Sequence, residues 1–189
     1  CPLTLDQFAE IYTLAAKKPF KLMCAATGDG VAKYMAPTTE QPQNNVLPTV
    51  FVDVSKLPDL QGASTNAAGF AAGATTPIAV VIDQLEQAAA ASPGYTVLAE
   101  HMKRIASVQI RSVASWAGNL MLTRQYPAFA SDMATILAAA GTQLRVMDIA
   151  SRLLVLLRWF LVSSLRARRM MGWWHDGVVA SYGCLRLHA

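Results

Sequence analysis

Apolar residues recur at helical spacing near the start of the chain. Between residues 4 and 16 they fall on one helical face, namely Leu5, Phe8, Ile11, Tyr12 and Ala15. Thr4 can cap this segment, and two lysines followed by Pro19 suit its end. The pattern predicts a helix over residues 4–16. The apolar run at residues 132–140 predicts another helix, with Gly141 as its C-cap.

Short apolar runs between these helices predict strands. They cover residues 21–26, 49–54, 69–73 and 142–147. Composition predicts further helices over residues 78–91 and 98–106, with Pro93-Gly94 ending the first of them. Residues 108–114 then leave the second helix, and residues 115–119 form a tight turn. Helices and strands mixed in this order indicate an α+β (α/β) fold.

Composition narrows the protein class. Of the 189 residues, 53% are hydrophobic and 15% are charged, whereas soluble domains carry about 25% charged residues. The chain is therefore not intrinsically disordered. Three scattered cysteines (Cys1, Cys24 and Cys184) are too few for a disulfide scaffold or a zinc site, and they indicate a reducing, cytoplasmic location. Because the first residue is not methionine, we expect a fragment or a processed product.

Charge is unevenly divided along the chain. Residues 150–189, the C-terminal segment, carry six arginines against one aspartate, while residues 1–149 carry ten basic and eleven acidic residues. Without a basic surface, the first part is not expected to bind nucleic acid. These differences predict a boundary near residue 150, between a domain at 1–149 and an unmatched, basic and apolar helical tail at 150–189.

The C-terminal segment contains the most apolar stretch, 13 residues from Leu153 to Leu165. A membrane span needs about 20, so no spanning helix and no membrane partner are expected. The spacing instead predicts a helix over residues 149–171 that does not complete a binding site. The alternative is an amphipathic helix on a membrane surface, since arginine with leucine and tryptophan is typical of one.

No catalytic constellation emerges from the polar residues. The histidines (His101, His175 and His188) lack metal-ligand spacing and a nucleophile partner. What remains are two turns of small residues, at 24–30 and 115–119. Such turns bind anions because backbone N–H groups converge where no Cβ blocks approach. Together they are consistent with a pyrophosphate held from both sides, and we expect them to meet at one cleft.

Four stretches resemble one known family. HMKRIASVQIRSVASWAGNL at residues 101–120 resembles the IA-x-x-QIRN-x-AS-x-GGN run of the flavin domain of xanthine dehydrogenases and aldehyde oxidases. KLMCAATGDG at 21–30, VFVDVSKLPDLQG at 50–62 and SDMATILAAAGTQLRV at 131–146 resemble further segments in the same order. The resemblance implies an FAD-binding PCMH-type domain, with a small N-terminal βαβ-like subdomain and a larger mixed one, incomplete at its C-terminus.

The resemblance also implies the residues that bind FAD. Those of the first FAD loop are Leu22, Met23, Cys24, Ala25, Ala26, Thr27, Gly28 and Asp29. Ser115, Gly118 and Asn119 would hold the other side of the cofactor. Asp132 matches an acid that contacts FAD, and Ile105 matches a side chain beside the flavin.

The sequence departs from the family at small residues. Ala25 and Ala26 replace Gly-Asn, and Ala117 replaces the first glycine of GGN. Alanine costs little where φ is negative and about 1 kcal/mol where φ is positive.

The resemblance implies an oxidoreductase module that passes electrons from iron–sulfur clusters through FAD to NAD or oxygen. The iron–sulfur and molybdenum-binding parts would be its partners, and this segment alone is not expected to be active. The alternative is a non-enzymatic remnant that no longer binds FAD.

Overall fold

The computed structural model of the chain describes residues 1–15, 17–28, 50–67, 69–125, 130–147, 154–158 and 184–187. Its helices are α1 (Leu5–Ala15), α3 (Ile78–Gln87), α4 (Pro93–Met102), α5 (Val108–Val113), α6 (Trp116–Gln125) and α7 (Asp132–Ala139), with 3-10 turns η1 (Pro58–Leu60) and η2 (Ala89–Ala91). Its strands are β1 (Phe20–Met23), β2 (Val50–Asp53), β3 (Ala63–Asn66), β4 (Gly69–Gly73), β5 (Gln143–Met147), β6 (Leu154–Arg158) and β7 (Cys184–Leu187). This mixture confirms the expected fold class.

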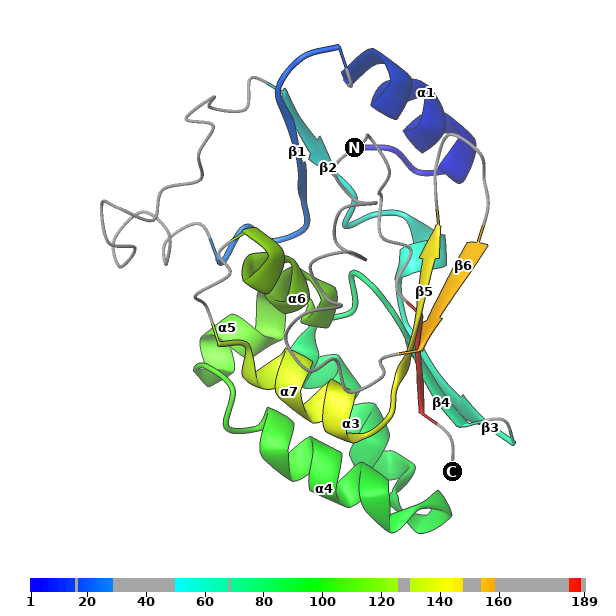
Figure 1. Cartoon of the computed structure of the whole chain (residues 1–189), viewed down its shortest axis with the longest axis vertical. Coiled ribbons are helices and arrows are strands. Elements are labelled where there is room, and N and C mark those ends of the chain that lie inside the picture. Colours follow the sequence, from blue (N-terminus) through cyan, green and yellow to red (C-terminus); the bar gives the residue numbers. More distant parts are fainter. Residues whose placement is uncertain are drawn as a thin grey trace.

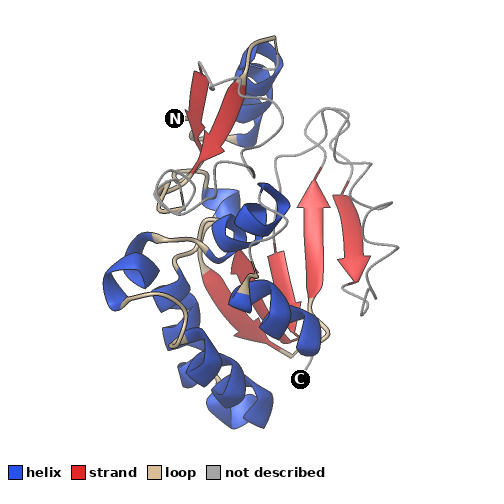
Figure 2. Cartoon of the chain, turned by 60° about the vertical axis from the view of Figure 1, so that its left-hand side comes forward, coloured by secondary structure: helices blue, strands red, loops and turns tan. Residues whose placement is uncertain are grey.

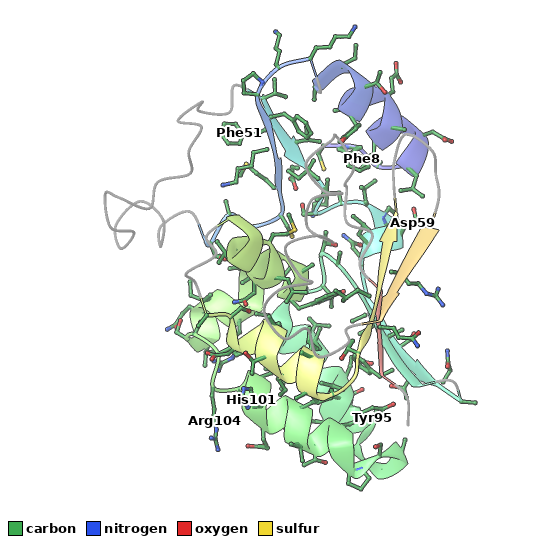
Figure 3. All side chains as sticks on the ribbon, in the orientation of Figure 1. Phe8, Phe51, Asp59, Tyr95, His101 and Arg104 are labelled. Carbon is green, nitrogen blue, oxygen red and sulfur yellow. The ribbon has the colours of Figure 1, made fainter. Side chains whose placement is uncertain are left out.

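A small N-terminal unit contains α1 and the parallel pair β1–β2. The predicted first helix and both strands are confirmed. Tyr12 on α1 meets Phe20 on β1 edge to face, with ring centroids 5.3 Å apart. Figure 3 shows Phe8 between α1 and the strands, and Phe51 on the opposite side of β2. Phe8 is buried, whereas Phe51 is 57% exposed, so α1 covers only one face of this small sheet.

The larger unit is a five-stranded sheet in the order β3–β4–β7–β5–β6. Helices α3 to α7 gather on one side of it (Figures 1 and 2). Phe70 of β4 is fully buried against Tyr95 of α4, with ring centroids 6.0 Å apart. The core therefore lies between the sheet and the helices.

The helix predicted over residues 98–106 begins earlier, at Pro93, and ends earlier, at Met102, as α4. Pro93-Gly94 does not end a helix but opens α4, because the Ser92 hydroxyl accepts a hydrogen bond from the Gly94 amide and proline suits the first helical position. The segment after it is also helical rather than extended. Ser107 caps α5 by accepting from the Ile110 amide at 3.3 Å.

The predicted tight turn at residues 115–119 is wrong, since this stretch is the first turn of α6. The Ser115 hydroxyl accepts from the Gly118 amide at 3.1 Å, which caps the helix despite the glycine. The buried Trp116 indole donates to the Gly73 carbonyl at 2.6 Å. This bond fastens the start of α6 to the end of β4.

The helix predicted over residues 149–171 is also wrong where the structure describes it. Residues 154–158 form β6, paired antiparallel with β5, and β7 lies between β4 and β5. A continuous apolar run fits a strand as well as a helix, and cross-strand pairing decides between them. The division of the chain at residue 150 stays a prediction, although the sheet contains strands from both sides of it.

Candidate functional site

A cleft of about 380 Å³ lies between the N-terminal unit and the helices. One wall is the segment after β1, residues 24–28, and the other is the beginning of α6. Figure 1 shows β1 leading down to this region from the top of the molecule. The expectation that two small-residue segments far apart in sequence meet at one cleft is therefore confirmed. The volume is in the range of cofactor sites.

Small residues let the first wall approach the second. An ideal Cβ on Gly28 would lie 2.6 Å from Cδ2 of Leu122 on α6, so glycine permits this close contact. Ala26 has a φ of 52°, a left-handed conformation that is strained for alanine. Ala25 is not among the positive-φ residues. Of the two alanines that replace Gly-Asn, only Ala26 therefore carries the backbone strain.

Cys24 lines the cleft but is not an activated nucleophile. Its thiol lies 3.8 Å from the Thr75 carbonyl oxygen. Burial raises the pKa of the Cys24 thiol, the nearby Asp53 carboxylate raises it further, and a hydrogen bond with Ser115 partly opposes them. The thiol is therefore protonated at neutral pH and acts as a small, weakly polar wall residue.

The second wall is a capped helix start without a competing charge. Ser115 is buried and pairs with Pro77 in an isolated β-bridge, which fixes where α6 begins. The first turn of α6 contains no acidic residue, so the positive end of the helix dipole is not neutralised there. Gly118 is exposed on the cleft, and an ideal Cβ there would lie 3.0 Å from Ser115 Oγ, the one contact within 4 Å among the described residues outside the adjacent backbone.

The loop between α4 and α5 completes the wall with apolar side chains. Ile105 is buried and lines the cleft beside Ala106 and Ile110. Ala106 also has a left-handed φ, of 51°. The Arg111 guanidinium donates to the carbonyls of Ile105 and Ala106 at 2.7 and 3.0 Å. These charge-assisted bonds hold the strained loop in place.

The start of α7 meets the start of α6 at the edge of the cleft. The hydroxyl of Ser131, the N-cap of α7, accepts from the Ala134 amide at 2.9 Å and donates to Oδ1 of Asn119 at 2.5 Å. Asn119 and Asp132 both line the cleft. Ser131 is therefore the N-cap, and Asp132 is the first residue of α7.

The structure brings together every described residue that the family resemblance assigns to FAD binding. Those lining the cleft are Leu22, Met23, Cys24, Ala25, Ala26, Thr27, Gly28, Ile105, Ser115, Gly118, Asn119 and Asp132. Asp29 lies outside the described residues. Sequence reasoning missed Thr75, Ala106, Met121 and Leu122, which also line the cleft. Reading residues 116–125 as a helix would have found the last two, one turn beyond Gly118.

Within the described residues we find no second site built on histidine, no metal site and no membrane span. His101 is exposed on α4 and does not line the cleft (Figure 3). Across the described ranges, no group of three or more histidine, cysteine or acidic side chains is placed to hold a metal ion. None of the described helices is both long and apolar enough to cross a membrane.

Comparison with known proteins identifies relatives over most of the chain. The family model described as the FAD binding domain in molybdopterin dehydrogenase matches residues 2–170, past residue 148 where the motif resemblance ends. A putative aldehyde oxidase-like protein of Oryza sativa subsp. japonica is 31% identical over an alignment of 169 residues that covers 85% of this chain and 12% of that protein. The chain thus spans about a tenth of the length of the curated relatives it matches.

Solved structures share the fold at low sequence identity. Carbon monoxide dehydrogenase from Oligotropha carboxidovorans has a TM-score of 0.65 at 17% identity, with 100% of this chain and 57% of that chain covered. Quinoline 2-oxidoreductase from Pseudomonas putida 86 has a TM-score of 0.65 at 15% identity, with 99% and 57% covered. The expected fold is confirmed, and the alternative of a non-enzymatic remnant that no longer binds FAD is not favoured.

Proposed function

Because the chain belongs to the family of FAD-binding domains of molybdopterin dehydrogenases, we propose that its cleft binds FAD within an aldehyde oxidase-like molybdenum hydroxylase. One observation carries the proposal. Residues 22–28 and the start of α6, the two segments that resemble FAD loops, line the same cleft. The residues present also fit the cofactor, as each part of the cleft matches a different part of it.

The start of α6 fits the pyrophosphate of FAD. A helix N-terminus favours negative charge, and this one has no acidic residue in its first turn. Gly118 leaves open the space that a side chain would fill, so that a phosphate can approach the backbone. Thr27, on the opposite wall, adds a hydroxyl that can donate to the same group.

The remaining cleft fits the uncharged parts of FAD. Ile105, Ile78 and Ile110 present apolar surface on which a flat ring system can lie. Asp132, at the start of α7, supplies a carboxylate that can accept hydrogen bonds from sugar hydroxyl groups. Asp132 and the first turn of α6 line the same cleft, so the pyrophosphate would have to lie on the α6 side, away from the Asp132 carboxylate.

This chain binds and orients, and the cofactor supplies the electron transfer when bound. We propose that electrons reach it from iron–sulfur clusters and leave to NAD or oxygen. The chain spans only about a tenth of its aldehyde oxidase relatives, so the iron–sulfur and molybdenum-binding parts would be separate domains or subunits of a cytoplasmic enzyme. Cys24, protonated and half-buried, would exclude water from the cofactor and not react with it.

The test is to block the cleft at Gly118. Gly118→Val adds a branched side chain on the cleft, with its Cβ 3.0 Å from Ser115 Oγ, and we expect the affinity for FAD to fall at least tenfold, about 1.4 kcal/mol or more. Gly94→Val is the matched control, because Gly94 lies at the start of α4 outside the cleft, where a Cβ would likewise face the hydroxyl that caps the helix, Ser92 Oγ at 3.5 Å. Equal binding by both variants, with both folded by circular dichroism, would show that FAD does not use this cleft.

A further inference from the structure

We propose that Ser131 is a positioning residue, which orients the Asn119 carboxamide so that its NH2 group faces the anionic part of the ligand. This rests on the proposed function, because the anion in question is the pyrophosphate of FAD. Ser131 is 4% exposed and is not among the residues lining the cleft. It therefore acts through Asn119 and not by touching the cofactor.

The hydrogen bonds of Ser131 fix the direction in which its proton points. A serine hydroxyl has one proton and two lone pairs. One lone pair of Ser131 Oγ accepts from the Ala134 amide at 2.9 Å, and the proton goes to Asn119 Oδ1 at 2.5 Å. If the carboxamide were turned round, this buried hydroxyl would lose its acceptor. An unsatisfied buried donor is costly, so the carboxamide is held with its oxygen toward Ser131.

Holding the oxygen on the α7 side leaves the NH2 group as the outward part of Asn119. Asn119 is half-buried, lies in the first turn of α6 and lines the cleft one residue after Gly118. An NH2 group donates to an anion, whereas the carbonyl oxygen in the same place would repel it. The Asn119 carboxamide can present either its oxygen or its NH2 group, and Ser131 thereby orients it with the NH2 group toward the ligand site before the ligand binds.

The experiment is a double-mutant cycle on FAD affinity, measured by titration of the purified chain with flavin fluorescence as the signal. Ser131→Gly removes the hydroxyl but keeps a residue that tolerates the N-cap position. We expect it to weaken FAD binding about tenfold. Ser131→Thr keeps the hydroxyl and should restore the wild-type affinity. Ser92→Gly is the matched control, since Ser92 is also a serine N-cap, accepting from the Gly94 amide at the start of α4, and lies outside the cleft.

The cycle separates positioning from a general loosening of α7. If Ser131 acts through Asn119, then Ser131→Gly has no further effect in an Asn119→Ala chain. An equal loss in both backgrounds would overturn the proposal, because it would mean that movement of α7 and Asp132 causes the effect. Unchanged affinity of Ser131→Gly beside a wild type that binds FAD would also overturn it, while leaving the proposed function intact. A wild type that does not bind FAD would overturn both.

Discussion

Two alanines with left-handed backbone lie on the cleft, Ala26 and Ala106. For an L-residue this conformation costs about 1–2 kcal/mol relative to the right-handed one. Strain of this kind persists where surrounding contacts hold it, and at Ala106 the Arg111 guanidinium does so. Backbone strain is thus concentrated at the candidate site.

The strain at Ala26 can be tested by substitution with glycine. Ala26→Gly should raise the free energy of unfolding by about 1 kcal/mol, because glycine adopts a positive φ without a steric penalty. Ala25→Gly, at the neighbouring position without a positive φ, should lower it by about 0.5–1 kcal/mol through the added freedom of the unfolded chain. Urea denaturation measures both. The same sign of change at both positions would contradict the assigned backbone conformation.

The Cys24 thiol provides a second test at this scale. Because its pKa is raised by burial, we expect Cys24 to be alkylated by iodoacetamide at pH 8 much more slowly than the exposed Cys1. Folding favours the protonated thiol, so the contribution of Cys24 to the free energy of unfolding is fully present below the ordinary thiol pKa of 9.0 and is lost as the pH rises through the raised pKa of the folded state. Peptide mass spectrometry measures each rate. Equal rates for Cys24 and Cys1 at pH 8 would contradict the burial of this thiol.

At the scale of elements, the sequence predicts best where periodicity and caps agree. The amphipathic pattern of residues 4–16, and the apolar run at residues 132–140 that ends before Gly141, predict helices close to those found. Prediction from the sequence fails at proline and glycine, because each can lie either in a turn that ends a helix or in the first turn of one. Pro93 predicts a helix end because proline stops a preceding helix, but it opens α4 behind a serine cap. Gly118 predicts a turn, but Ser115 caps a helix by accepting from its amide.

The C-terminal strands could not be inferred from local pattern at all. The first four residues of β6, at 154–157, are a solid apolar run, and the strand conformation of β6 depends on pairing with β5. Residues of β7 pair with β4, more than a hundred positions earlier. Such long-range pairing leaves no mark in the spacing of nearby residues, whereas helical periodicity is local.

The pairing of β6 and β7 with the rest of the sheet lets us predict the effect of removing the C-terminal segment. A chain ending at Met147 lacks β7, which pairs with both β4 and β5, and lacks β6. We expect its free energy of unfolding to fall by about 2 kcal/mol or more, at about 1 kcal/mol for each net backbone hydrogen bond. None of the described residues lining the cleft comes from beyond Asp132, so the folded fraction should bind FAD with similar affinity. Unchanged stability in urea would contradict the five-stranded sheet.

At the scale of the whole molecule, the prediction of the candidate site from sequence depends mainly on the family resemblance. Composition and periodicity indicate only two turns of small residues, and the motif at 101–120 adds Ile105 and the assignment to FAD. Physical reasoning from sequence could not place Met121, Leu122 or Thr75, because their position in the cleft follows from α6 being a helix and from the link between Thr75 and Leu60. The network around Ser131 likewise appears only once α6 and α7 are brought together.

The central claim is that this chain binds FAD in its cleft, and retention of flavin by the purified chain tests it most directly. The protein is incubated with excess FAD and desalted, and its absorbance spectrum is recorded beside that of Gly118→Val. We expect close to one FAD per chain in the wild type, with the flavin bands shifted from those of free FAD by the apolar wall at Ile105. A folded wild-type chain that retains no flavin, or a Gly118→Val chain that retains as much, would contradict the claim.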